Sequence, residues 1–200
     1  MQFFSFLING ISLGSVYALI ALGYTMVYGI AKMLNFAHGD VIMIGSYVVY
    51  FAFGASGLNP VLSIVLSMIV CTILGVVIER LAYRPLREAP SLAVLITAIG
   101  VSYLLQQVAQ LSWSSNPKSF TSVVSGMKPV SLFGGQLTIS AETIVTIVAC
   151  VVIMVVLMWF VNYTPAGHAM LAVSEDRGAA QLMGVNVNGT ISLTFAIGSA

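Results

Sequence analysis

Four apolar runs, each about as long as a bilayer is thick, place the strongest constraint on how this chain can fold. They are Phe6–Ala31, Pro60–Ala82, Leu92–Leu111 and Glu142–Val161. A helix needs about 20 mainly apolar residues to cross the ~30 Å hydrocarbon core of a bilayer. Only 6% of the 200 residues are charged, against about 25% in soluble domains. The sequence therefore predicts an all-α fold, a polytopic membrane helical bundle.

A fifth apolar stretch, Val41–Phe53, has 13 residues and reaches only about 20 Å as a helix. It crosses the membrane only if the polar segment Met33–Asp40 is included, and otherwise it is re-entrant. We therefore expect a broken or short second span. A last run, Thr190–Ala200, covers about half a span. Residues 1–200 are accordingly interpreted as one transmembrane domain, truncated before further helices.

Loop charge predicts the orientation. Three arginines lie in the short loop Arg80–Ser91, at positions 80, 84 and 87. Because cytoplasmic loops are enriched in Lys and Arg, this loop should face the cytoplasm. By parity, Lys32 and the segment Thr164–Gly189 should also be cytoplasmic, and Ser112–Ala141 should lie outside. A small hairpin is expected in that outer loop around Gly134-Gly135.

The segment Thr164–Gly184 holds three of the thirteen charged residues of the chain. It is expected to form two short helices. Thr164 is suited to cap the first, with Pro165 in its first turn, and Ser174 to cap the second. Gly184 is a fitting C-terminal stop. One face should then carry mostly small residues, namely Ala172, Asp176, Ala179, Ala180 and Met183.

Three polar residues, Asn35, His38 and Asp40, directly precede the undersized helix. Broken helices in transporters place such ends near the middle of the membrane, facing anionic substrate groups. A zwitterionic amino acid would suit this site, with its ammonium group near Asp40. Alternatively, the three residues lie at the cytoplasmic interface and Asp40 only caps the helix.

Two further patterns concern helix packing. Small residues recur every four positions in the first span, at Gly10, Gly14 and Ala18, which favours close packing within the chain or with a partner subunit. Gln106 and Gln110 share a helix face and are expected to bridge helices. Cys71 and Cys150 sit in apolar runs, which favours packing roles over a disulfide or metal pair.

Several activities find no support in the sequence. The net charge is +1, so no basic face suggests nucleic acid. The chain contains no P-loop and no H-E-x-x-H motif, and no metal-ligand spacing surrounds either histidine. No sequence pattern resembles a catalytic nucleophile paired with a general base. We therefore expect a transport subunit without cofactor or metal, and not an enzyme.

The chain resembles the permease subunits of the branched-chain amino acid (leucine, isoleucine and valine) class of ABC importers. The resemblance runs over essentially the whole chain and rests on the order and spacing of five motifs. They are Asn9–Leu19, Leu34–Asp40, Ile78–Arg87, Ala98–Ser102 and Thr164–Gly184. Members of the family commonly have Arg at the positions of His168 and Leu171, which weakens an argument for cationic docking through this loop.

The resemblance implies partners and a role for the cytoplasmic segment. The partners are two cytoplasmic ATPase subunits that hydrolyse ATP, a second homologous permease, an external substrate-binding protein and the lipid bilayer of the bacterial inner membrane. In such importers a short coupling helix docks on the ATPase. The coupling residues would be Gly167, Glu175, Asp176, Arg177, Ala179, Ala180 and Gly184.

Other functions stay open at this stage. Similar permeases import urea or short-chain amides, because selection resides largely in the external binding protein. An ion-coupled secondary carrier would need a charged relay deep in its spans, for which only Asp40 is a candidate. A third alternative is a structural or assembly subunit with no pathway of its own.

Overall fold

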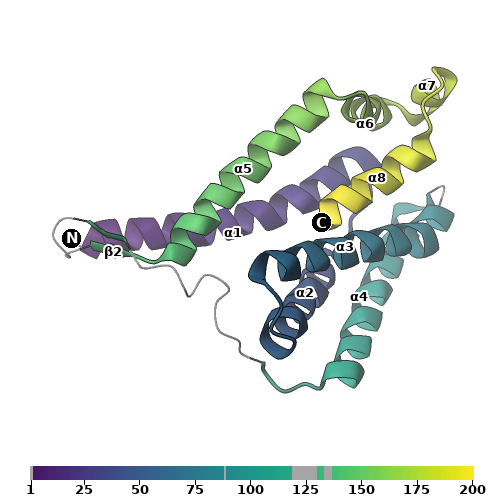
Figure 1. Ribbon diagram of the computed structural model, residues 1–200. Helices are drawn as coiled ribbons and strands as arrows, with labels where there is room; N and C mark the ends of the chain where they lie inside the picture. Colours follow the sequence, from purple (N-terminus) through teal and green to yellow (C-terminus); the bar gives the residue numbers. More distant parts are fainter. Residues whose placement is uncertain (1, 88, 119–129, 133–136) are drawn as a thin grey trace.

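The computed structural model describes residues 2–87, 89–118, 130–132 and 137–200, which form a bundle of helices (Figure 1). The long helices are α1 (Gln2–Ala31), α3 (Pro60–Ile78), α4 (Ser91–Trp113) and α5 (Ala141–Tyr163). Helices α1, α4 and α5 each contain one of the predicted spans, and α3 with the two helical turns that follow it contains the fourth; each of these four segments is long and apolar enough to cross a membrane. The predicted all-α, multi-pass membrane fold is confirmed.

The second span is short and begins inside the molecule. Helix α2 (His38–Val49) continues directly into a π-helical turn, η1 (Tyr50–Ala55). At 1.5 Å per residue the two together rise about 27 Å, which exceeds the reach of the apolar run alone. The non-helical link before α2 is mostly buried, with Asn35 3% and Ala37 0% exposed. Irregular backbone is tolerated at membrane depth where protein buries it.

The chain returns to the same end of the bundle after α2 and α3. Helix α3 continues into a π-helical turn, η2 (Glu79–Tyr83), and then a 3₁₀ turn, η3 (Arg84–Leu86). Lys32, just after α1, and Arg87, just after η3, line one cavity. A re-entrant α2 would leave these two residues at opposite ends. The geometry therefore fits an α2 that goes across and an α3 that comes back.

The long loop between α4 and α5 contains a small hairpin. Strand β1 (Val130–Leu132) pairs antiparallel with β2 (Leu137–Ile139), with Val130 opposite Ile139 and Leu132 opposite Leu137. The predicted hairpin is confirmed in these residues, and its Gly134-Gly135 turn lies outside the described residues.

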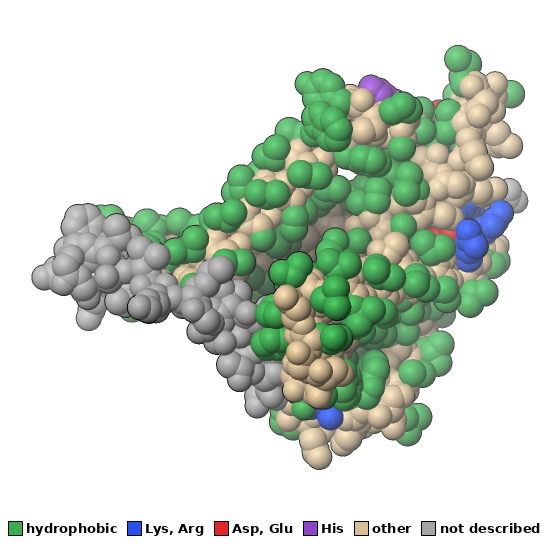
Figure 2. All heavy atoms as spheres, in the orientation of Figure 1, with side chains coloured by type: hydrophobic (Ala, Val, Ile, Leu, Met, Phe, Trp, Pro, Cys, Tyr) green, Lys and Arg blue, Asp and Glu red, His purple; other side chains and the backbone are tan. Residues whose placement is uncertain are grey.

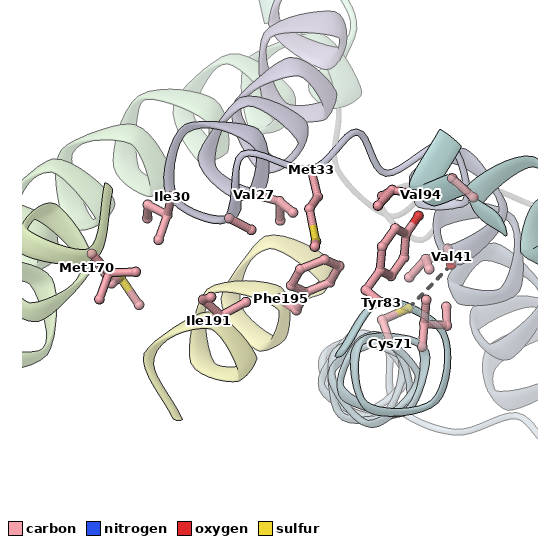
Figure 3. Packing of buried hydrophobic residues seen from close by; sticks show 14 of the residues in the cluster. Val27, Ile30, Met33, Val41, Cys71, Tyr83, Val94, Met170, Ile191 and Phe195 are labelled. Atoms are coloured by element: carbon pink, nitrogen blue, oxygen red, sulfur yellow. Dashed lines mark hydrogen bonds between the residues drawn. The ribbon is translucent and has the colours of Figure 1, made fainter. Parts of the chain in front are cut away.

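Two short helices, α6 (Pro165–Glu175) and α7 (Arg177–Leu182), follow α5 at one end of the bundle. Helix α8 (Val187–Ser199) then runs back between α1 and α3 (Figure 1). Its Phe195 is 0% exposed, and the Phe195 ring lies 5.4 Å from that of Tyr83. Figure 3 shows Phe195 at the centre of the buried cluster, beside Met33 and Tyr83. Helix α8 therefore forms the middle of the core.

Glycines allow α8 to approach its neighbours closely. A Cβ on Gly23 of α1 would lie 2.7 Å from the carbonyl oxygen of Gly198. A Cβ on Gly75 of α3 would overlap the side chain of Ser199. By contrast, a Cβ on Gly10 or Gly14 would meet nothing within 4 Å. The predicted small-residue stripe thus does not pack within the chain at these two positions, which leaves a partner subunit or lipid beside it.

Candidate functional site

Helix α6 is folded back sharply onto the end of α5. The hydroxyl of Thr164 accepts a hydrogen bond from the Gly167 N–H at 3.0 Å, and Pro165 opens the helix. The predicted cap and first turn are confirmed. A Cβ on Gly167 would overlap the backbone of Phe160 and Val161, so only glycine fits this turn.

Helix α7 begins later than predicted. Ser174 lies inside α6, and Asp176 is the residue that caps α7. Its carboxylate accepts hydrogen bonds from the N–H groups of Gly178 at 2.7 Å and Ala179 at 3.0 Å. The prediction that Ser174 caps this helix was wrong. Asp and Ser are about equally favourable as N-caps, so the sequence alone did not decide between Ser174 and Asp176. Gly184 has φ +86°, and its predicted role as the helix stop is confirmed.

One side of α6 and α7 is held by the bundle. Met170 and Val173 are 0% and 1% exposed, and Ala180 is 4% exposed. The Arg177 guanidinium donates a hydrogen bond to the carbonyl of Ala31 at the end of α1. Of the five residues predicted to share one face, four are exposed and only Ala180 is buried, because the chain bends at Asp176. As a result Ala180 faces the interior and is not available to a partner.

The other side of the segment is exposed. Glu175, Asp176 and Ala179 face outward. Leu182 and Met183 are 90% and 85% exposed although they lie outside the four candidate spans. Sequence reasoning missed Leu182, whose signal was a pair of adjacent large apolar residues at the end of a polar segment. Contiguous exposed apolar patches are typical of sites that contact another protein or a membrane.

The predicted patch of Asn35, His38 and Asp40 is buried, with exposures of 3%, 6% and 7%. Its members contact different neighbours. Asn35 accepts a hydrogen bond from the Tyr83 hydroxyl at 3.0 Å. His38 lies against Gly23 and the Tyr24 ring of α1. The patch thus joins the start of α2 to surrounding helices.

One alternative predicted that Asp40 caps α2, and the structure shows that this was wrong. The N-cap position belongs to Ala37, and Asp40 lies in the first helical turn, where the helix dipole favours a carboxylate. Its Oδ1 accepts a hydrogen bond from Gln106 Nε2 at 2.9 Å. The bridging role predicted for Gln106 is confirmed, since this bond joins α4 to α2.

A cavity of about 500 Å³ adjoins His38 between α1, α2, α3 and α8. Its walls are mainly aliphatic, with Leu19, Ile20 and Ile42 among them, and Ser46 and Ser67 add hydroxyl groups. The size and the mainly apolar lining are typical of small-molecule sites. Of the three patch residues, His38 is the one that lines this cavity.

A buried acid ties α8 to α3. The Glu79 side chain is 0% exposed and forms an ion pair with Arg87. Its other oxygen accepts a hydrogen bond from the Ser192 hydroxyl at 2.6 Å. Arg87 also donates to the side-chain oxygen of Asn188. The sequence near Glu79 does not reveal this network, because α8 supplies partners that lie more than 100 positions away.

Comparisons with known proteins agree with the family resemblance found in the sequence. Residues 6–200 match the family model described as "Branched-chain amino acid transport system / permease component". The chain is 42% identical over 206 residues to the high-affinity branched-chain amino acid transport system permease protein BraD of Pseudomonas aeruginosa. That alignment covers 97% of this chain and 66% of BraD.

Two further relatives carry the LivH name. The high-affinity branched-chain amino acid transport system permease protein LivH of Escherichia coli K12 is 39% identical, over 100% of this chain and 68% of that protein. A probable LivH of Methanocaldococcus jannaschii is 28% identical, over 91% and 58%. The chain thus spans about two thirds of the length of BraD and of the bacterial LivH. No solved structure matches it.

Proposed function

The chain belongs to the family of permease components of branched-chain amino acid transport systems, and on that premise we propose that it is a transmembrane subunit of an ATP-driven importer. The substrates would be branched-chain amino acids, and the site would be the bacterial inner membrane. ATP hydrolysis would take place on two cytoplasmic ATPase subunits. A second homologous permease and an external binding protein would complete the assembly.

The two-sided build of residues 164–184 carries this proposal. Its outer side presents Leu182 and Met183, flanked by the charged residues Glu175 and Asp176. Its inner side is attached to the bundle through Gly167, Arg177 and Ala180. A movement of an ATPase bound to the outer side would therefore be transmitted directly to α1, α5 and α8. This is the construction that a coupling element between an ATPase and membrane helices requires.

We assign the coupling roles by side. Glu175, Asp176, Ala179 and Gly184 would contact the ATPase together with Leu182 and Met183, whereas the three inner residues would transmit the motion. The substrate path would run through the cavity beside His38. Asn35 and Asp40 would act on that path indirectly, by holding the start of α2.

The test is capture of the purified ATPase subunits by the full-length permease in detergent. Leu182→Asp should weaken capture at least tenfold, because fully burying a leucine side chain is worth about 1.5–3 kcal/mol. The matched control is Leu111→Asp, since Leu111 is 87% exposed at the opposite end of the bundle, in the last turn of α4. Equal capture by the two variants would refute the coupling role.

Orientation is tested separately. A cysteine introduced at Leu182, in a chain without Cys71 and Cys150, should react with an impermeant maleimide only in inside-out vesicles. Labelling from the outer face of intact cells would exclude any contact with a cytoplasmic ATPase.

Substrate choice is tested with the assembled transporter. Uptake of radiolabelled leucine should be competed by isoleucine and valine. Competition by urea or short-chain amides in place of these would support the alternative that similar permeases suggest. Uptake that persists without the ATPases and depends on an ion gradient would indicate a secondary carrier.

A further inference from the structure

An open cavity of about 470 Å³ lies where the ends of α1, η3, α4 and α7 meet, and apart from Arg177 none of its lining residues has a role in the proposed transport path or coupling. Three basic side chains line it, Lys32 after α1, Arg87 after η3 and Arg177 at the start of α7. Apolar side chains, among them Leu34 and Leu95, form the rest of its wall. Figure 2 shows Lys and Arg side chains gathered at the end of the bundle where α3 ends, on an otherwise mostly hydrophobic face.

The charges that the described residues place around this cavity do not balance. Within the described part of the chain, the one ion pair is that between Arg87 and Glu79, so Lys32 and Arg177 have no carboxylate partner there. The carbonyl end of α1 offsets roughly half a charge, and the amide end of α4 at Ser91 adds about as much of the opposite sign. Burial lowers the pKa of the Arg177 guanidinium, and the neighbouring charge of Arg87 lowers it further. Among the described residues, about two positive charges therefore stay uncompensated.

Two local details fit a site built for an anion. Lys32 adopts φ +53°, a left-handed conformation that costs a residue with a Cβ about 1–2 kcal/mol and that glycine would adopt without strain. A lysine thus occupies this position although the backbone conformation there favours glycine. In addition, the buried Nε–H of Arg87, a residue that lines the cavity, has no hydrogen-bond partner among the described residues.

We propose that this cavity binds the phosphate of an anionic phospholipid headgroup. Lys32 and Arg87 directly follow candidate spans, and Ser91 begins the next one, so the cavity lies at headgroup level. Basic pockets between helix ends on the cytoplasmic side are typical sites for anionic lipids. From its first turn onward, α4 exposes the apolar stripe of Leu92, Ile96 and Ile99, with exposures of 68%, 61% and 40%. This stripe would receive the acyl chains.

A lipid bound there would join α7 to α1 and α4 by charge, because Arg177 is part of α7 and Lys32 follows α1. The inference concerns a lipid site beside the proposed transport role. Its test reads lipid binding directly and does not depend on ATPase capture or uptake, so the two proposals can fail separately.

The experiment incorporates the full-length protein in phosphatidylcholine nanodiscs that contain a minority of phosphatidylglycerol. Native mass spectrometry then counts the phosphatidylglycerol that the released protein retains. Each basic side chain near anionic lipid contributes about 1 kcal/mol, or about fivefold. The variant K32Q/R177Q should therefore retain phosphatidylglycerol about thirtyfold less well than the wild type. The charge-preserving variant K32R/R177K should retain it normally, which excludes a folding defect.

The matched control is R80Q/R84Q, which removes two exposed charges from the same end of the bundle but outside the cavity. Equal loss in this control would mean general surface attraction and would overturn the site. Displacement of the lipid by millimolar inorganic phosphate would identify a free-anion site and overturn the lipid assignment. Glu88 lies outside the described residues. If the wild type retains no phosphatidylglycerol and E88Q does, Glu88 neutralises the cavity and the proposal fails.

Discussion

Replacing the buried acid Glu79 tests whether the contact between α8 and α3 depends on a polar network. In Glu79→Gln the side chain keeps its volume and can still accept the hydrogen bond from Ser192, but Arg87 loses its counter-charge. Removing one partner of a buried ion pair costs about 3–5 kcal/mol. The Arg87 side chain is 11% exposed, so some hydration remains, and we expect a loss of about 3 kcal/mol in the free energy of unfolding.

The measurement is reversible unfolding in mixed micelles, followed by the fluorescence of the two tryptophans. Arg87→Gln should destabilise by a similar amount because it leaves the carboxylate unpaired. The double variant E79Q/R87Q should cost less than either single change, since no buried charge is left without a partner. The reasoning is refuted if Glu79→Gln costs under about 1 kcal/mol, or if the two single losses simply add in the double variant.

Three smaller predictions use the same unfolding measurement. Gly23→Ala should cost about 1–3 kcal/mol because its Cβ would lie 2.7 Å from a carbonyl of α8. The matched control Gly10→Ala, in open space, should be neutral or stabilise by up to about 1 kcal/mol because alanine is the better helix former, and equal losses would contradict the close contact. Thr164→Ala should cost about 1 kcal/mol by removing the cap of α6, and no change would mean that solvent replaces the cap. Tyr83→Phe should cost about 1–3 kcal/mol because it leaves Asn35 buried without its donor at 3.0 Å; a stabilised variant would show that the bond is not formed.

Features that depend only on neighbouring residues were predicted well from the sequence. The four spans follow from residue counts and hydropathy, and they were predicted to within a few residues. The cap at Thr164, the first turn at Pro165 and the stop at Gly184 also depend on neighbours along the chain. Where two local signals competed, as at Ser174 and Asp176, the sequence could not choose between them.

The site residues illustrate the other case. Glu79 is separated from Ser192 by 113 positions, and Asp40 from Gln106 by 66. Membrane helices are apolar on every face, so the periodicity that reveals the buried side of a soluble helix is weak here. For the same reason the glycines that bring helices together, such as Gly23, could not be told from those that face open space, such as Gly10.

By itself, then, the amino-acid sequence determined that this is a membrane protein, where its long apolar helices lie, which residues begin α6 and end α7, and its family, because hydropathy and capping act over a few residues. Only the tertiary structure decided which buried polar groups meet and which side of residues 164–184 faces outward. Those outcomes depend on helix register across the bundle, and that register is set by contacts between segments far apart in the chain.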